Sequence, residues 1–279
     1  MKVAVFSDIQ ANLPALEETI EQIERWRPDL VVMAGDLVNR GPDSGGCLRR
    51  FDEMRRDRGW LPVNGNHEEW VLASEHRSVE TPGERALWGF TQWAWSQCAA
   101  DAERLRGWAD HLTFHPPESD AWVHVTHGTM AGNRDGITPG RSDESLVGAL
   151  PEDIALFIAG HTHRPHQRRT QCMLVVNVGS AGSPFDGDPR GSFGRFVWQH
   201  GRWQAEIRRF DYDRDQARRD FLNSGFLDQS PLARIVYHEW ERAELLIAGW
   251  RERYQQAVLA GELDAERSVR DYLQGLGLE

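Results

Sequence analysis

Along residues 1–65, short apolar runs alternate with segments in which hydrophobic residues recur at helical spacing. This pattern predicts alternating strands and helices. Short apolar runs predict buried strands at 3–6, 30–34 and 61–63. Hydrophobic residues recur at helical spacing over 13–26, with Asn12 placed to cap that helix and Pro28 to end it. A second helix is predicted around 44–56. Strands and helices in this order predict a parallel sheet with right-handed crossovers.

The pattern changes in the middle of the chain. Residues 68–118 lack strand patterns and are predicted to form a helical insertion or cap. Strands are then predicted at 121–126, 154–159, 173–178, 193–198 and 202–208. His200-Gly201 separates the last two and predicts a tight hairpin turn. From about residue 213 the chain is helical and polar again, including one long stretch at 231–259.

These elements predict an α/β domain over residues 1–212, with a helical insertion at about 68–118. A helical extension at 213–279 is expected to pack on it. Two interpretations of the additional helices stay open. They shape the entrance of a site or a contact between copies of the chain, or they only cover the domain.

Composition narrows the classes of function. The net charge of −11 argues against a broad nucleic-acid surface, which needs clustered Lys and Arg. No apolar run approaches the ~18 residues of a membrane helix, and the chain begins at once with a strand, so neither a membrane span nor a secretory signal is expected. Three widely spaced cysteines, Cys47, Cys98 and Cys172, indicate reduced thiols in a cytoplasmic protein.

Side chains that bind metals follow the predicted strands directly. They are Asp8, Gln10, Asp36, Asn66, His67, His127, His161 and His163. Loops at the carboxyl ends of strands in an open α/β sheet converge on one crevice, so these distant residues can surround one point. Oxygen and imidazole ligands without thiolate suit Mn²⁺, Fe, Zn²⁺ or Mg²⁺.

Each of these signals is ambiguous alone. Asp8 could cap a helix, Asp36 could belong to a turn, and a lone histidine such as His127 is more often structural. His161-Thr162-His163 is more specific, because alternate residues of an extended segment can address two neighbouring ions. Together, the strand-end positions favour a metal site over a purely structural interpretation.

The motifs resemble those of the calcineurin-like metallophosphoesterase superfamily over roughly residues 1–210. The similar segments are Asp8-Ile9-Gln10, the loop 35–41, Gly65-Asn66-His67-Glu68, Thr126-His127-Gly128 and Gly160-His161-Thr162-His163. The opening residues 7–16 and the segment 177–190 are similar to the small bacterial phosphodiesterase branch. By contrast, the loop 35–41 with Arg40 also resembles diadenosine tetraphosphate hydrolases and serine/threonine protein phosphatases.

The resemblance implies a double-layered β sandwich flanked by helices and two divalent ions bridged by Asp36. Asp8, Gln10 and His163 would complete the first metal site. Asn66, His127 and His161 would complete the second. Two such ions activate a water and bind the phosphate in a hydrolysis. His67 would act as general acid on the leaving oxygen, and Arg40 would bind a phosphate oxygen unless it is simply a surface arginine.

Gln10 departs from the family pattern, which has histidine at this position. Its carbonyl is a poorer ligand than imidazole for Zn²⁺ or Fe and is better tolerated by Mn²⁺ or Mg²⁺, so manganese is the first choice of metal. Three outcomes compete: weaker binding at the first site with catalysis retained, a shift of preference toward Mn²⁺, or loss of catalysis.

The leading hypothesis is a metal-dependent phosphodiesterase or phosphomonoesterase acting on a small phosphorylated molecule, with nucleotides among the candidates. A protein phosphatase or dinucleoside polyphosphate hydrolase is the second hypothesis. A non-catalytic module that binds a phosphorylated ligand is the third. The helical extension is the candidate surface for contact between copies of the chain.

Overall fold

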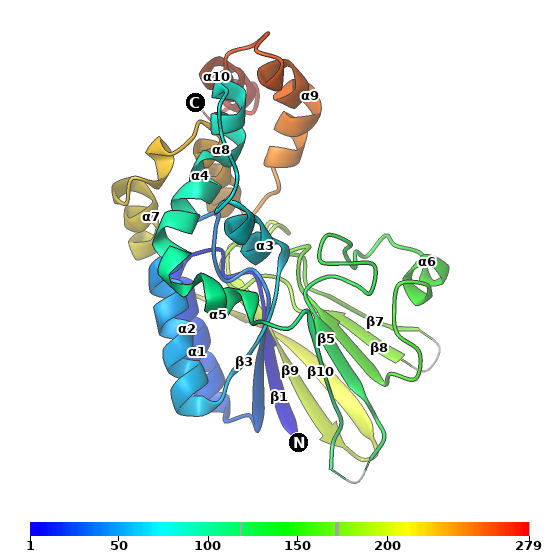
Figure 1. Cartoon of the computed structure of the whole chain (residues 1–279). Coiled ribbons are helices and arrows are strands. Elements are labelled where there is room, and N and C mark those ends of the chain that lie inside the picture. Colours follow the sequence, from blue (N-terminus) through cyan, green and yellow to red (C-terminus); the bar gives the residue numbers. More distant parts are fainter. Residues whose placement is uncertain (118, 171–172, 279) are drawn as a thin grey trace.

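Two five-stranded sheets face each other in the computed structural model, which describes residues 1–117, 119–170 and 173–278 (Figure 1). The first sheet has the order β10 (Arg202–Phe210), β9 (Gly191–Gln199), β1 (Lys2–Phe6), β2 (Leu30–Ala34) and β3 (Leu61–Val63). The second has the order β4 (His111–Phe114), β5 (Val123–Thr126), β6 (Leu156–Ala159), β8 (Met173–Asn177) and β7 (His166–Thr170). The predicted α/β fold with two sheet layers is confirmed.

Each sheet contains three neighbouring parallel strands, as the alternation of strands and helices predicts, and in the first sheet these are β1, β2 and β3. β1 and β2 pair in parallel with Val3 opposite Leu30, and β5, β6 and β8 are parallel to one another. Alternate side chains of a strand point to the same face of a sheet. Val3 of the first sheet and Val123 of the second therefore meet in one fully buried cluster, which forms the core between the two layers.

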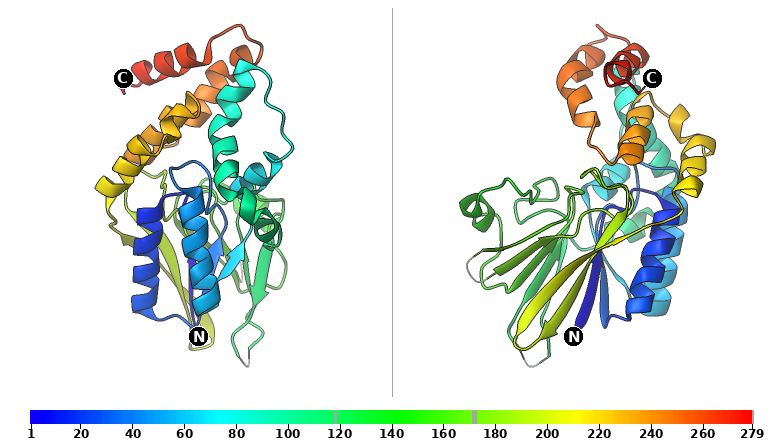
Figure 2. Two further views of the ribbon diagram at one scale, coloured as in Figure 1. Left: turned by 60° about the vertical axis from the view of Figure 1, so that its left-hand side comes forward. Right: turned by 180° about the vertical axis from the view of Figure 1, so that it is seen from behind.

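Helices cover the outer face of the first sheet and one end of both sheets (Figures 1 and 2). The α-helices are α1 (Leu13–Trp26), α2 (Ser44–Arg58), α3 (Asn66–Ala73), α4 (Pro82–Cys98), α5 (Ala102–Arg106), α6 (Asp143–Val147), α7 (Arg214–Asn223), α8 (Leu232–Arg242), α9 (Ile247–Leu259) and α10 (Ala265–Gly275). The side chain of Asn12 caps α1 as predicted, by accepting a hydrogen bond of 3.3 Å from the backbone N–H of Ala15.

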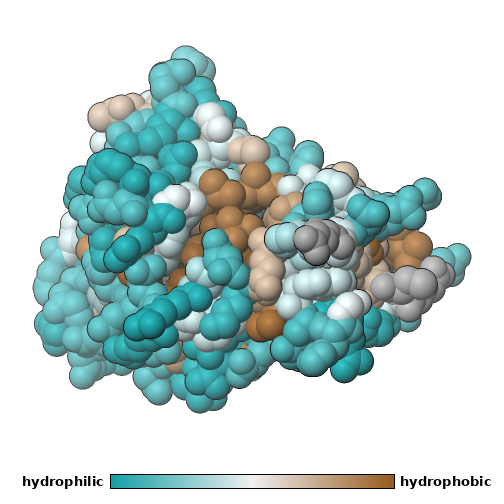
Figure 3. All heavy atoms as spheres, turned by 90° about the horizontal axis from the view of Figure 1, so that it is seen from below, coloured by the Kyte–Doolittle hydropathy of each residue, from teal (hydrophilic) through white to brown (hydrophobic). Residues whose placement is uncertain are grey.

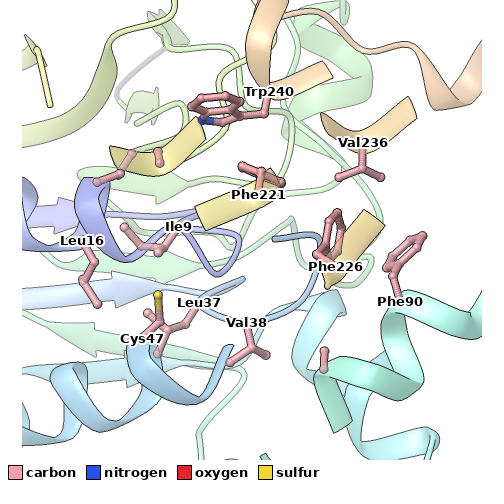
Figure 4. Close-up of a cluster of buried hydrophobic side chains, with 14 of the residues drawn as sticks. Ile9, Leu16, Leu37, Val38, Cys47, Phe90, Phe221, Phe226, Val236 and Trp240 are labelled. Atoms are coloured by element: carbon pink, nitrogen blue, oxygen red, sulfur yellow. The ribbon is translucent and has the colours of Figure 1, made fainter. Parts of the chain in front are cut away.

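The C-terminal helices pack on the same hydrophobic cluster as the N-terminal ones (Figure 4). Ile9 and Leu16 belong to this cluster together with Phe221 of α7 and Trp240 of α8, and all four are almost fully buried. The rings of Phe221 and Trp240 lie 5.0 Å apart. Burial of one large side chain of this kind contributes about 1.5–3 kcal/mol. A continuous core therefore joins the last third of the chain to the first sheet.

Three local expectations were wrong. His111–Phe114, within the expected helical insertion, is the edge strand β4, because β5 supplies an antiparallel partner for it. His166–Thr170, for which no strand was expected, is the edge strand β7. Both strands have alternately exposed residues, so neither shows the continuous apolar run of a central strand. The predicted long helix at 231–259 is interrupted between α8 and α9, where Ala243 has a left-handed backbone conformation.

The end of the molecule that carries the N-terminus has hydrophobic residues gathered at its centre and hydrophilic residues around them (Figure 3). The carboxyl ends of β1 and β2 lie at the opposite end, below α8 and α9 (Figure 1). Among the described residues, no helix is both long and apolar enough to cross a bilayer. Cys47 and Cys98 are buried free thiols, and Cys172 lies outside the described residues.

Candidate metal centre

Loops that follow strands of both sheets carry the predicted site residues to one point. Asp8 follows β1, Asp36 follows β2 and Asn66 follows β3, whereas His127 follows β5 and His161 follows β6. Several of these loop residues have left-handed backbone conformations, with φ of 57° at Asp8, 53° at Gln10, 59° at Asp36, 56° at Arg40, 69° at His161 and 55° at His163. Each such residue costs on the order of 1 kcal/mol or more and is typical of functional sites.

Asp36 lies at the centre of this group. One carboxylate oxygen each of Asp8 and Asp36 and a ring nitrogen of His127 all lie within 4.8 Å of one another. Asp36 Oδ2 accepts a hydrogen bond of 3.0 Å from Gln10 Nε2 and lies 3.3 Å from His127 Nε2. His127 Nε2 is in turn 3.0 Å from Asn66 Oδ1. Residues that follow four different strands thus meet around one carboxylate.

The two remaining histidines complete the group on the side of Asp8. His163 Nε2 lies 3.0 Å from Asp8 Oδ1, and the backbone N–H of His161 donates a hydrogen bond of 3.0 Å to Asp8 Oδ2. The ring of His161 lies 5.1 Å from the ring of His127. All seven residues predicted as metal ligands are therefore brought together, including Gln10.

The hydrogen bonding within this group fits a cation. Gln10 Oε1 is a buried acceptor oxygen without a hydrogen-bond partner in the described part of the chain, and Asp8 Oδ1 has His163 Nε2 at 3.0 Å but no well-aligned hydrogen bond. Buried polar atoms are rarely left unpaired in native proteins, and an ion is one explanation for them. Carboxylate, amide and imidazole donors suit divalent ions such as Mn²⁺. The residues present thus match the metal-binding role.

The charges of these buried groups depend strongly on one another. Burial tends to raise the pKa of Asp36, but the positive charge and the hydrogen bond of His127 lower that pKa far below its usual range. Burial tends to lower the pKa of His127, and the charge and hydrogen bond of Asp36 raise it. The site therefore holds buried carboxylate charge that needs a positive partner.

Two glycines allow the loops to approach one another this closely. A Cβ added to Gly65 would collide with the carboxylate of Asp36, and one added to Gly160 would collide with Ser7 and with Asp8 Oδ2. Only glycine fits where another loop passes directly above the backbone.

His67 stands beside this group with a defined orientation. Its Nδ1 accepts a hydrogen bond of 2.9 Å from the amide Nδ2 of Asn39, and its Nε2 lies 3.9 Å from Asp36 Oδ2. Burial lowers the pKa of His67 well below its usual value, so the ring is neutral near pH 7. Because Nδ1 accepts, the single ring proton resides on Nε2 and faces the site.

Sequence reasoning missed the buried carboxylate of Glu68. It accepts hydrogen bonds from the backbone N–H groups of Asp36 (2.8 Å), Leu37 (2.7 Å) and Gly65 (2.9 Å). Burial and the neighbouring Asp36 charge raise the pKa of Glu68 to about 7. Glu68 thus fixes the loop after β2 to the loop after β3. Its position directly after Asn66-His67, within the segment 65–68 that resembles a family motif, is the signal that could have revealed it.

Sequence reasoning also missed the partner of Arg40, which is Glu239 in α8. The two side chains form a buried ion pair, and Glu239 is fully buried. The other oxygen of Glu239 accepts hydrogen bonds from the N–H groups of Leu246 (2.8 Å) and Ile247 (2.7 Å), at the start of α9. The guanidinium of Arg40 also lies 5.7 Å from the ring of Phe185. A C-terminal helix therefore holds a predicted substrate-binding arginine in place.

A cavity of about 580 Å³ opens onto this centre. Asp36, Asn66, His161 and His163 form its floor, and Arg40 and His67 line it as well. The cavity is also lined by residues of α9 and of the segment between α8 and α9, namely Leu245, Ile247, Ala248 and Arg251. The volume suits a small organic ligand.

Comparison with known proteins gives consistent matches. Residues 1–199 match the family described as the calcineurin-like phosphoesterase superfamily domain. Serine/threonine-protein phosphatase 1 of Salmonella typhimurium is 38% identical over 111 residues, which is 37% of this chain and 46% of that protein. Phosphodiesterase YfcE of Escherichia coli is 23% identical over 198 residues, covering 68% of this chain and 84% of that one. A metallophosphoesterase structure from Sphaerobacter thermophilus superposes with a TM-score of 0.67 at 21% identity, over 87% of this chain and 100% of that chain.

Proposed function

The chain belongs to the calcineurin-like phosphoesterase superfamily of metal-dependent hydrolases, and from that premise we propose that it hydrolyses a phosphodiester or phosphomonoester of a small molecule. The single observation that carries this proposal is the gathering of six further residues with oxygen or nitrogen donors around Asp36, next to a histidine and an arginine. Nucleotides are among the candidate substrates.

We propose that the site holds two divalent ions and that Asp36 would be a ligand of both. Asp8, Gln10 and His163 would hold the first ion, and Asn66, His127 and His161 the second. Mn²⁺ is our first choice because Gln10 offers a neutral oxygen in place of an imidazole, and Fe, Zn²⁺ and Mg²⁺ remain alternatives. The buried oxygen Gln10 Oε1, which has no hydrogen-bond partner in the described chain, supports the first of these two sites.

Divalent ions in such a site acidify a water molecule and neutralise charge on the phosphoryl oxygens. The side chains of this chain would supply the remaining functions. Arg40, held by Glu239, is placed to donate to a phosphoryl oxygen at the cavity floor. Water attacks phosphorus, the ester P–O bond breaks, and the leaving oxygen would take the Nε2 proton of His67 in its imidazolium form, which leaves the neutral imidazole. The negative charge of a bound phosphoester favours that form. Asn39 holds the ring with Nε2 toward the site, and such a transfer contributes about 10²–10⁴ in rate.

A second candidate is a serine/threonine protein phosphatase or a dinucleoside polyphosphate hydrolase. The match to the Salmonella typhimurium phosphatase and the loop 35–41 with Arg40 favour this class. However, this chain spans less than half of that phosphatase, so the match covers a part of it only. The third candidate is a non-catalytic module. It would use the same seven donor residues to bind a phosphorylated ligand but would not hydrolyse that ligand.

We propose residues 1–212 as the catalytic domain, with its insertion at about 68–118, and 213–279 as an extension that supplies one wall of the cavity. The buried free thiols Cys47 and Cys98 support a cytoplasmic location. The extension is also our candidate surface for contact between copies, which analytical ultracentrifugation would test.

The function is tested by hydrolysis of bis(4-nitrophenyl) phosphate with added Mn²⁺. We expect turnover that a chelator abolishes and that Asp36→Asn lowers to background. A comparison of a monoester, a diester and a dinucleoside tetraphosphate would then separate the first two candidates. If the metal-loaded protein binds phosphate and hydrolyses none of these esters, the non-catalytic interpretation replaces the proposal.

A further inference from the structure

A second chamber of about 340 Å³ adjoins the metal cavity. The two chambers adjoin at four residues that line both of them: Arg40, His67, Trp70 and Arg251. Four predicted metal ligands, Asp36, Asn66, His161 and His163, line the first chamber, and none lines the second. The second lies between α3, α4 and α9 and has an apolar wall of Leu87, Trp88 and Phe90. His67 therefore lies at the boundary between the metal end and a partly aromatic space.

The charged side chains that line the second chamber are all positive. Among the described residues that line it are three arginines, Arg40, Arg134 and Arg251, and no carboxylate. This is notable in a chain whose net charge is −11. Arg134 pairs with Glu69 at 3.1 Å, and Arg40 pairs with Glu239. Arg251 has no hydrogen-bond or salt-bridge partner among the residues that the structure describes.

Arg251 lies close enough to Arg40 for their charges to interact. Partial burial and the Arg40 charge lower the pKa of Arg251, and the Glu239 charge raises it. Two guanidinium groups that share one cavity are stabilised by an anion that binds between them. A guanidinium can bind a carboxylate or a phosphate through two parallel hydrogen bonds. Arg251 is therefore a free binding group for a second negative charge.

We propose that Arg251 binds an anionic group on the leaving portion of the substrate, and that the second chamber holds this portion. The inference rests on the proposed hydrolysis, in which His67 protonates the leaving oxygen and so sets the direction in which the leaving group extends. The substrate class is a phosphoester whose leaving alcohol carries an apolar or aromatic part and a further carboxylate or phosphate. Residues 213–279 thus determine specificity for this class.

The binding test uses non-hydrolysable ligands and the Mn²⁺-loaded full chain. Calorimetry compares phenylphosphonate with its analogues that carry a carboxylate at ring position 3 or 4. In the wild-type protein, one of the two carboxylates should tighten binding by about tenfold, as one charge-assisted hydrogen bond does. Arg251→Gln should abolish that gain, and Arg251→Lys should retain part of it.

Arg253→Gln is the matched control, because Arg253 lies on the same helix α9 but lines neither chamber. It should keep the full gain from the carboxylate. The proposal is overturned if neither carboxylate tightens binding to the wild-type protein, or if Arg251→Gln keeps the gain. Hydrolysis of the matching phenyl phosphates is measured separately. Absence of turnover with the binding pattern intact would refute the hydrolysis and leave the anion subsite in place.

Discussion

At the scale of single residues, Gln10 is the main departure of this site from its family pattern. Its amide Nε2 donates to Asp36 Oδ2, and its buried Oε1 has no hydrogen-bond partner in the described chain. The unpaired oxygen is the atom that an ion would use. In the proposed first metal site, Gln10 would therefore be a ligand, but a weaker donor than imidazole.

We expect Gln10→His to tighten Mn²⁺ or Zn²⁺ binding at the first site by about tenfold, or about 1.4 kcal/mol, while hydrolysis is retained. The reason is that imidazole donates to these ions more strongly than an amide oxygen. Calorimetric metal titration of both proteins measures the change. Gln22→His, on α1 and away from the site, is the control. Unchanged affinity at the first site would mean that residue 10 does not contact the ion.

A second residue-scale prediction concerns His124, a buried histidine of β5 outside the site. Its ring stacks on those of His111 (4.9 Å) and Phe157 (5.3 Å), and its Nε2 has no hydrogen-bond partner in the described chain. Burial and the neighbouring His111 lower the pKa of His124 to about 4, from 6.5 in the unfolded chain. The folded state thus favours the neutral ring, and its stabilising contribution is complete above pH 6.5 and is lost as the pH falls toward 4.

His124→Phe should therefore remove one source of acid sensitivity. Between pH 7 and pH 5, the free energy of unfolding of the wild type should fall by about 1–2 kcal/mol more than that of the variant. Urea denaturation at both pH values measures the difference. Equal losses in the two proteins would show that His124 titrates alike in the folded and unfolded states.

At the scale of elements, the strands that surround the site could be predicted and some of their neighbours could not. β1 and β2 are short, β-branched and buried, and such patterns are local. β4 has an alternately exposed pattern, and only its pairing with β5 makes it a strand. The proposed metal ligands could be predicted because each of them follows a strand that has a local sequence signal. The pairing of Arg40 with Glu239, 199 residues away, depends on how α8 packs and has no local signal.

Glu239 pairs with Arg40 through one carboxylate oxygen and binds the N–H groups of Leu246 and Ile247 through the other. It is therefore a positioning residue for Arg40. Glu239→Gln keeps an acceptor for the N–H groups of Leu246 and Ile247 but removes the charge that holds Arg40. Breaking one side of a buried ion pair costs about 3–5 kcal/mol. We expect lower stability by urea denaturation and a KM for phosphoester that rises more than kcat falls.

The control for this element is Glu241→Gln, since Glu241 lies on the same helix but is only partly buried. It should change neither KM nor stability by more than the ~0.5 kcal/mol typical of surface substitutions. If Glu239→Gln lowers stability and leaves KM unchanged, Glu239 contributes to the fold alone and Arg40 does not depend on it for substrate binding.

At the scale of the whole molecule, the helical extension and the sandwich share one hydrophobic cluster. Phe221, Phe226 and Trp240 pack with Ile9 and Leu16 from the first part of the chain (Figure 4). Loss of a single large core side chain costs about 3–5 kcal/mol, and net stabilities are about 5–15 kcal/mol. Residues 1–212 are therefore not expected to stay folded without residues 213–279, although the two parts differ in sequence pattern.

A chain that ends at residue 212 should aggregate or lose cooperative thermal unfolding, as measured by circular dichroism and light scattering. A chain that ends at residue 276 is the control and should unfold with a Tm close to that of the full protein, because it retains α7 to α10 almost completely. A cooperative transition of the shorter chain at an unchanged Tm would contradict the shared core.

The proposed ligands are divided between the two sheets, with Asp8, Asp36 and Asn66 on one side and His127, His161 and His163 on the other. The unfolded chain does not hold these two sets of residues together, so an ion that both sets bind has no equivalent site there. Binding of the ion therefore stabilises the folded state. Each tenfold rise in the free ion concentration above Kd adds about 1.4 kcal/mol per site to the free energy of unfolding. A chelating buffer should consequently act as a mild denaturant of this protein, and heat resistance should follow the manganese concentration of its surroundings.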